Sequence, residues 1–203
     1  MTYPYGASGA KFGPEDWHWN TLTLAAGAIS SPAILLRSGI GPKAALADLG
    51  IELVADLPGV GAGLADHPVT WLLLIPKPGN CDPQTPLAQV VLRYTAPGSA
   101  EFNDMQQVIF SHVDVAGVGG EQAVVTVGTP LAIGLPVALQ RPRTRGRLQL
   151  VSTDPRVQPL IQLNFVADPE DLRRLIAGVR LAWHIAHQPE IVRHTRRVAL
   201  LSE

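Results

Sequence analysis

The pattern of hydrophobic and polar positions changes near residue 68 of this 203-residue chain. Upstream, an alternating run over 20–28 predicts a strand that ends in a tight turn. Two short helical runs follow, over 32–38 and 42–49, each bounded by glycine and proline. Residues 1–19 show no period, and we interpret them as a loosely ordered leader.

The residues at the ends of the two short helices suit the chemistry of helix starts and stops. The Ser31 hydroxyl can accept an unpaired N–H of the first turn, which makes this residue a good N-cap. Pro32 suits the first helical position, where its missing N–H costs nothing. Gly39 and Gly50 suit the left-handed stops that follow the two helices. The sequence therefore predicts a strand, a sharp turn and two short helices.

Downstream of residue 68 the chain reads as an antiparallel sheet with long Pro- and Gly-rich connections. Four β-prone runs predict its strands, over 69–75, 89–95, 104–115 and 122–129. A further strand is predicted over 146–152, followed by a turn at "TDPRVQP".

The last predicted element is a helix that starts after Asp168. Asp168 can cap it, Pro169 fits the first helical position, and Glu170 and Asp171 place negative charge in the first turn. Seven apolar residues then recur at helical spacing and predict one buried stripe: Leu172, Leu175, Ile176, Val179, Ala182, Trp183 and Ala186.

Composition narrows the class of protein. The net charge of -1 provides no basic field for nucleic acid or an anionic membrane, and the longest apolar run, "VTWLLLIP", is too short to span a bilayer. The first residues have no apolar core of a signal peptide. Cys81 is the only cysteine, so no intramolecular disulfide can form. We expect a cytoplasmic protein that does not bind membranes or nucleic acid.

Two further patterns suggest ligand sites, one for a nucleotide and one for a metal, but the sequence supports neither. Gly59, Gly61 and Gly63 do not have the spacing of a nucleotide-binding loop, and they predict a glycine-rich connection. A metal site could be built from His184, His187 and His194, but no carboxylate is implied as a partner. Solvated histidines are the simpler interpretation, and we predict no metal.

The stretch "GAISSPAILLRSGIG", residues 27–41, closely resembles the second signature of the glucose–methanol–choline (GMC) oxidoreductases, which are FAD-dependent enzymes. Ten fixed positions of that signature are matched, at Gly27, Ala28, Ser31, Pro32, Ile34, Leu35, Ser38, Gly39, Ile40 and Gly41. Three further stretches resemble family segments in the expected order: "LPGVGAGLADHP", "NDMQ" and "RGRLQLVSTDPRVQPLIQLNFVADPEDL". Gly63 stands where the family usually has Asn.

The resemblance implies a mixed α+β and α/β fold, a partial GMC fold. Residues 20–67 would be pieces of a Rossmann-like FAD-binding domain. Residues 68–203 would form part of a substrate domain with an antiparallel sheet flanked by helices, and 141–203 would start the C-terminal family segment. The implied reaction is oxidation of a small-molecule alcohol, in which a base takes the hydroxyl proton and hydride passes to the flavin.

The same resemblance suggests the residues of the site. Cofactor contacts are expected at Ala26, Gly27, Ala28, Ser31, Asp66 and His67, and substrate contacts at Gln106 and His112. Small residues at 26–28 would let the backbone approach FAD closely, although a tight strand-to-helix turn explains them equally well. Both histidines also have a simpler interpretation. His67 could have a structural role within its motif, and His112 could be a packed or solvated residue of its strand.

The chain also departs from the family pattern. A GxGxxG loop after a first strand, which would hold the FAD pyrophosphate, is not found, and neither is the first family signature. The family's catalytic His lies beyond the helix that should end near Gln188, so no catalytic residue is assigned. We therefore expect a truncated or split chain that is inactive alone. Alternatives are an interaction subunit for a partner chain that supplies the missing segments, and an unstable remnant.

Overall fold

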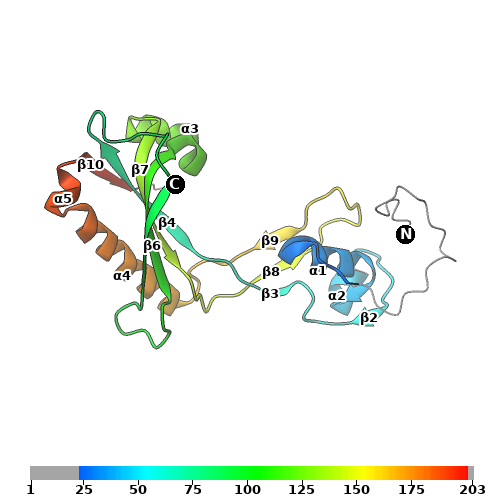
Figure 1. Ribbon diagram of the computed structural model, residues 1–203. Coiled ribbons are helices and arrows are strands. Elements are labelled where there is room, and N and C mark those ends of the chain that lie inside the picture. Colours follow the sequence, from blue (N-terminus) through cyan, green and yellow to red (C-terminus); the bar gives the residue numbers. More distant parts are fainter. Residues whose placement is uncertain (1–22, 201–203) are drawn as a thin grey trace. The chain divides into compact units, whose positions relative to one another are not determined.

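The computed structural model describes residues 23–200, which form two compact units (Figure 1). The first unit combines residues 23–60 with 150–159, and the second combines 61–149 with 160–200. Within this described range, every helix is too short or too polar to cross a bilayer.

The first unit contains α1 (Gly27–Arg37), β1 (Ile40–Gly41), α2 (Lys43–Ala47) and β2 (Ala55–Asp56). The two short strands pair in parallel, with Ile40 opposite Ala55. Arg37, at the end of α1, donates through Nη2 to the carbonyls of Asp154, at 3.2 Å, and Val157, at 2.9 Å. These bonds hold the predicted turn over 153–159 against α1 and explain why this distant segment belongs to the first unit.

The predicted start of α1 is wrong. The helix begins at Gly27 and continues through Pro32, so Ser31 is not its N-cap. Residues 23–26, which the structure describes from the predicted strand over 20–28, do not form a strand. Instead, the Ser31 hydroxyl reaches back to accept the N–H of Ala26 at 3.0 Å. The predicted stop is confirmed, because Gly39 has a φ of 80°.

The second predicted helix and the predicted glycine-rich connection are both present, but the helix is shorter than predicted and the connection ends in a strand. The helix α2 is one turn long, and Gly50 ends the turn after it with a φ of 66°. The predicted connection over 59–63 runs into a short strand, β3 (Ala62–Leu64).

The second unit is built on a five-stranded antiparallel sheet in the order β10-β4-β7-β6-β5 (Figure 1). Its strands are β4 (Val69–Pro76), β5 (Ala88–Tyr94), β6 (Met105–Asp114), β7 (Leu131–Leu139) and β10 (Thr195–Leu200). A smaller antiparallel sheet joins β3, β8 (Gly146–Gln149) and β9 (Leu160–Gln162). The predicted antiparallel sheet is confirmed, as are β4, β5, β6 and β8.

The central strand β7 was not predicted, because Gly134 and Pro136 look like strand breakers. The structure explains the glycine. A Cβ at position 134 would lie 2.9 Å from Val113 Cγ1 and 3.0 Å from Trp71 Cζ3, so this strand crosses under two side chains that leave no room.

The run over 122–129 is helical rather than a strand. Residues 122–127 form the second part of α3 (Val115–Val127), a helix that is interrupted at Gly120, whose φ of 72° and ψ of 175° are not helical. Asp114 caps the first part by accepting the N–H of Ala116 at 3.1 Å. The β-branched residues of the run favour a strand locally. Burial decides against it, because Val115, Ala123 and Val127 pack together on the sheet.

Two hydrophobic clusters cover the two faces of the sheet. One face packs against α4 (Pro169–Ala186), through side chains that include Leu72, Leu135 and Val137. The opposite face carries the cluster that α3 completes. In it, the rings of Trp71 and Phe110 are tilted by 38° to each other, with 5.7 Å between their centroids. A single turn, α5 (Pro189–Val192), links α4 to β10.

The predicted cap of α4 is confirmed, but the predicted buried stripe is only partly right. Asp168 accepts the N–H of Glu170 at 2.7 Å. Leu172, Ile176 and Trp183 are each more than 40% exposed, whereas four residues spaced by four along the helix are buried: Arg174, Gly178, Ala182 and Ala186. The helix turns its small residues to the sheet because close approach leaves no space for large ones.

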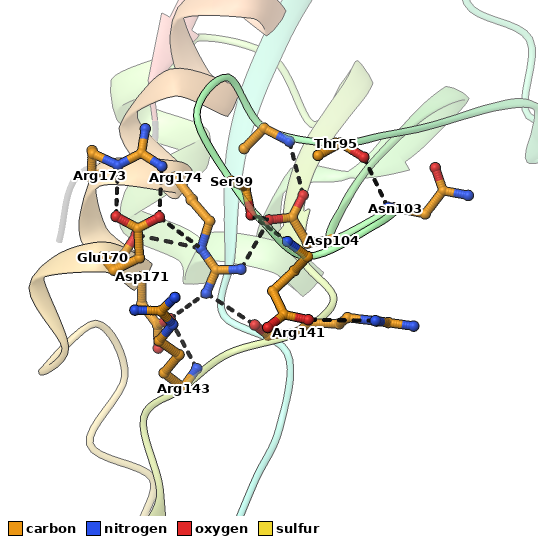
Figure 2. Close-up of polar contacts among 12 residues, drawn as sticks. Thr95, Ser99, Asn103, Asp104, Arg141, Arg143, Glu170, Asp171, Arg173 and Arg174 are labelled. Carbon is orange, nitrogen blue, oxygen red and sulfur yellow. Dashed lines mark hydrogen bonds and ion pairs between the residues drawn. The ribbon is translucent and has the colours of Figure 1, made fainter.

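The contact face of α4 also buries an ion network, shown in Figure 2. Arg174 has no exposed side-chain surface, and it donates to Asp104 Oδ2 at 2.9 Å and to Asp171 Oδ1 at 2.6 Å. It also donates to the carbonyl of Arg141 at 3.0 Å. One guanidinium thus joins α4, the start of β6 and the segment that follows β7.

Both buried carboxylates have further donors. Asp104 accepts from the Ala96 N–H at 2.8 Å and the Ser99 hydroxyl at 2.6 Å. Burial alone raises the pKa of Asp104, but these bonds and Arg174 outweigh it and hold the pKa below its usual range. Burial likewise raises the pKa of Asp171, and N–H groups of residues 143 and 144, together with Arg174, bring it below its usual range.

We expect Gly178→Val to destabilise the second unit by about 1–3 kcal/mol, because a Cβ there would lie 2.6 Å from both Met105 Cε and Val137 Cγ1. The measurement is urea denaturation followed by circular dichroism. Gly59→Ala is the control, since a Cβ at position 59 meets open space and should change stability little. Equal effects of the two substitutions would contradict the close packing of α4.

Arg174→Met should cost about 3–5 kcal/mol at pH 7, because it leaves two buried carboxylates without their cation. The exposed neighbour Arg173, which pairs with Glu170 at 2.6 Å, provides the control, and Arg173→Met should cost less than about 1 kcal/mol.

The sign of the pH dependence follows from the lowered pKa values of Asp104 and Asp171. Their stabilisation is complete above about pH 4, the usual range of aspartate, and is lost as the pH falls through their lower folded-state values. The cost of Arg174→Met, measured by urea denaturation, should therefore shrink at acid pH. An undiminished cost at pH 3 would contradict the network.

Candidate functional site

The first candidate surface is the sharp elbow at the start of α1. Gly27 has a φ of 80°, a conformation that other residues rarely adopt. Ala26, Gly27 and Ala28 are all exposed, and a Cβ on Gly27 would meet nothing within 4 Å. Ser31, one turn along, fixes the elbow through its bond to Ala26. The backbone of this elbow is therefore open to a ligand and shaped by a glycine.

The elbow suits the edge of a large planar or polar group. The first N–H groups of a helix have no partner within the helix and can donate to an external acceptor. The side chains at 26–28 are small, so the backbone can be approached closely. These observations fit the cofactor contacts that the sequence predicts at Ala26, Gly27, Ala28 and Ser31.

The second candidate surface is a charged hollow of about 500 Å³ in the second unit. Asp66 and His67 are exposed on its rim, and Asp66 Oδ1 accepts the His67 N–H at 2.7 Å. The remaining lining residues are Ala65, Glu101, Gln140, Arg141, Pro142, Arg143 and Arg145. Arg141 pairs with Glu101 at 3.5 Å, so part of the positive charge is balanced within the hollow.

A third feature, which the sequence did not indicate, is an apolar pocket of about 710 Å³ on the α4 side of the large sheet. Its size is that of a small-molecule site. Its lining comes from the sheet, α4, α5 and a loop: Leu74, Asn80, Gln89, Val90, Ile109, Ser111, Ile133, Leu135, Ile185, Ile191, His194 and Thr195.

The polar side chains of this apolar pocket have hydrogen-bond partners in the protein. His194 Nδ1 lies 2.8 Å from Asn80 Oδ1, and Arg193 Nε donates to His194 Nε2 at 3.1 Å. Both ring nitrogens are thus engaged, with the proton on Nδ1. Thr195 Oγ1 donates to the Ile191 carbonyl at 3.2 Å. The pocket therefore offers mainly hydrocarbon surface, and the folding of residues 77–81 onto 192–195 that builds it leaves no periodic signal in the sequence.

The two predicted substrate contacts both lie on β6, outside the lining of this pocket. Gln106 accepts from Arg93 Nη1 at 3.3 Å, across the β5–β6 pair. His112 Nδ1 lies 3.2 Å from the Ser111 hydroxyl, which donates to the Pro86 carbonyl at 2.8 Å. The same hydroxyl also lies 3.3 Å from the Leu87 carbonyl, so it is bonded to the backbone just before β5. A substrate role for Gln106 and His112 stays a prediction.

The predicted residues fall in both units. Ala26–Ser31 lie in the first, and Asp66, His67, Gln106 and His112 lie in the second. Over residues 23–200, the structure gathers no group of three His, Cys, Asp or Glu side chains that could hold a metal ion. His187 instead stacks on Trp183, with ring centroids 4.4 Å apart.

Two family models match the chain, and both describe GMC oxidoreductases. The N-terminal model covers residues 18–69 and the C-terminal model covers residues 142–201. The chain is 34% identical over 180 residues to 5-(hydroxymethyl)furfural oxidase of Methylovorus sp. (strain MP688), covering 87% of this chain and 32% of that protein. It is 31% identical over 183 residues to choline oxidase of Arthrobacter globiformis, covering 88% of this chain and 32% of that protein.

Several solved structures share the fold of this chain. Pyridoxine 4-oxidase from Mesorbium loti superposes with a TM-score of 0.71 at 21% identity, over 88% of this chain and 35% of that one. Formate oxidase of Aspergillus oryzae RIB40, from a study of FAD modification, superposes with a TM-score of 0.72 at 21% identity, over 85% of this chain and 38% of that one. The chain spans about a third of the length of the curated relatives it matches.

The elbow makes a direct prediction. Ser31→Ala should speed amide hydrogen exchange at Ala26 about fivefold, since a typical hydrogen bond contributes ~1 kcal/mol. The neighbouring Ser30→Ala is the matched control, because Ser30 is exposed and does not bond to Ala26. Exchange at Ala26 can be followed by NMR. Equal exchange in the two variants would mean that Ser31 does not fix the elbow.

Proposed function

This chain belongs to the GMC oxidoreductase family, and we propose that it is part of an FAD-dependent enzyme that oxidises a CH–OH group. The observation that carries the proposal is the exposed elbow, whose signature sequence falls within the N-terminal family match and whose Gly27 backbone is open to a ligand. The names of relatives support the class of reaction, since they include a 5-(hydroxymethyl)furfural oxidase, a choline oxidase and an alcohol dehydrogenase.

The elbow residues fit the cofactor. Ala26, Gly27 and Ala28 would present exposed backbone to FAD, and Ser31 would keep the elbow in shape. When bound, FAD would supply the hydride acceptor. Asp66 and His67 are proposed as further cofactor contacts, from an exposed rim that a large ligand can reach.

The substrate side of the proposal rests on the large sheet. Gln106 and His112 lie on β6 and are proposed to contact the alcohol. Gln106 is oriented by Arg93, whose guanidinium also donates to the Asn103 carbonyl at 3.1 Å. These residues would position the substrate, and none of them is proposed as the base that removes the hydroxyl proton.

We propose that turnover requires segments like those in the other two-thirds of the relatives' length. The test incubates the purified chain with FAD and a panel of primary alcohols, and follows flavin bleaching without oxygen. We expect no bleaching from the chain alone. Bleaching should appear when a companion polypeptide supplies those segments. Bleaching by the isolated chain would contradict the need for further segments, and none with the companion would contradict the proposed reaction.

Flavin retention tests the elbow itself. Gly27→Ala should weaken FAD retention after desalting about five- to thirtyfold, because the φ of 80° disfavours other residues by about 1–2 kcal/mol and the elbow would shift. Gly50→Ala is the matched control. Gly50 has a φ of 66°, also meets open space, and lies in the same unit, after α2 rather than at the start of α1. Visible absorbance gives the readout, and equal losses in both variants would remove the elbow from the cofactor site.

A further inference from the structure

The apolar pocket on the α4 side of the large sheet has walls that come from a single unit. Four strands of the sheet, the C-terminal end of α4, the α5 turn and the start of β10 all contribute to its lining. Every one of these elements belongs to the second unit. Packing within that unit therefore sets the shape of the pocket, and its volume of about 710 Å³ is in the range of sites that hold small molecules.

The pocket is separate from the contacts proposed for the alcohol. Ile109 and Ser111 of β6 line it, whereas Gln106 and His112 of the same strand do not. Successive side chains of a strand point to opposite faces of a sheet, so Ile109 and Ser111 share the face that α4 covers, and Gln106 points away from it. A molecule bound in this pocket is thus distinct from the substrate of the proposed reaction.

The lining indicates what the body of such a molecule is made of. Leucine, isoleucine and valine side chains supply most of the wall, and the polar side chains already have hydrogen-bond partners in the protein. Removing hydrocarbon from water against such a wall is favourable, at roughly 0.8 kcal/mol for each buried CH₂ group. The pocket therefore favours a ligand with an aliphatic body.

Two cations lie beside His194, which lines the pocket. Arg193 Nε donates to His194 Nε2 at 3.1 Å. Lys77 Nζ donates to the carbonyls of Val192, at 3.2 Å, and Arg193, at 2.9 Å, and so ties down the backbone that carries the arginine. The two terminal nitrogens of Arg193 have no hydrogen-bond partner in the part of the chain that the structure describes, residues 23–200. This guanidinium can therefore donate to a ligand.

The acids near the pocket do not cancel this positive charge within its lining, which contains no Asp or Glu. Of the acids nearest in sequence, Asp82 accepts the Gln84 N–H at 2.9 Å, and Glu190 is exposed on α5. A guanidinium matches the planar geometry of a carboxylate and forms charge-assisted hydrogen bonds to it. Charge complementarity thus favours a carboxylate beside His194.

We propose that this pocket binds a small amphiphilic anion, a carboxylate with an aliphatic body. The body lies between α4 and the sheet, and the carboxylate accepts hydrogen bonds from the terminal nitrogens of Arg193. Because Arg193 is exposed, its share of the affinity is modest, and the hydrocarbon surface supplies most of the binding. Binding requires neither the flavin nor the proposed oxidation, so it can be tested without either.

Isoleucine methyl NMR can show both whether and where the ligand binds, because four of the eleven isoleucines line the pocket: Ile109, Ile133, Ile185 and Ile191. The 203-residue chain, without FAD, is titrated with octanoate and, separately, with octanamide, which has the same body but no charge. Octanoate should shift the four pocket signals in a saturable way. Ile75, on the opposite face of the sheet, and Ile176, exposed on α4, should keep their positions.

The charge requirement is tested by comparing the two ligands in matched variants. In the parent chain, octanoate should bind about two- to fivefold more tightly than octanamide, as expected for an exposed ion pair. Arg193→Gln should abolish this difference. Arg180→Gln is the matched control and should preserve it, because Arg180 is an exposed arginine on α4 outside the lining. Both arginines are exposed, so both variants should fold.

A variant that fills the pocket tests the site of the hydrocarbon body. Ile109→Trp should weaken the binding of both ligands at least fivefold, and the remaining methyl signals report whether this variant stays folded. Equal affinities of the parent chain for octanoate and octanamide would overturn the proposed carboxylate. Pocket signals that do not shift, as when another part of the polypeptide fills the space, or shifts as large at Ile176 as in the pocket, would overturn the site.

Discussion

The buried guanidinium of Arg174 is the constraint on which the second unit depends. It is surrounded by Asp104 from the start of β6, Asp171 from its own helix and a carbonyl of the segment after β7. Such a charge is tolerated in the interior only when its partners are complete, and here each partner comes from a different element. The network therefore fixes where α4 lies along the sheet, and every side chain on that helix follows from its position.

The position of α4 then decides what the rest of this face can do. Gly178, Ala182 and Ala186 let α4 lie close to the sheet, and the Gln107 amide donates to the Gly178 carbonyl at 2.9 Å. The apolar pocket lies beside the C-terminal end of α4, where Ile185 and Ile191 line it together with side chains of the sheet. The same constraint turns Leu172, Ile176 and Trp183 outward.

Local chemistry made much of this predictable from the sequence. The Asp168 cap, the Gly39 stop and four strands were right because short-range rules decide them. Tertiary packing overrode those rules elsewhere. Gly134 breaks a strand pattern but is needed under Trp71, and the β-branched run of α3 is helical because its buried side faces the sheet. Asp104 and Arg174 are 70 residues apart, so no local pattern could pair them. The elbow residues were identified by a signature, whereas the pocket beside His194 depends on long-range contacts.

We propose that the elbow at the start of α1 contacts the flavin. Hydrogen exchange followed by mass spectrometry, on the 203-residue chain with and without FAD, tests it most directly. FAD should slow hydrogen exchange in the peptide over 24–32, while the peptides of β6 and β7 keep the same exchange rates. Unchanged exchange over 24–32 in a sample that retains flavin would contradict the account, because the cofactor would then be held elsewhere on the chain.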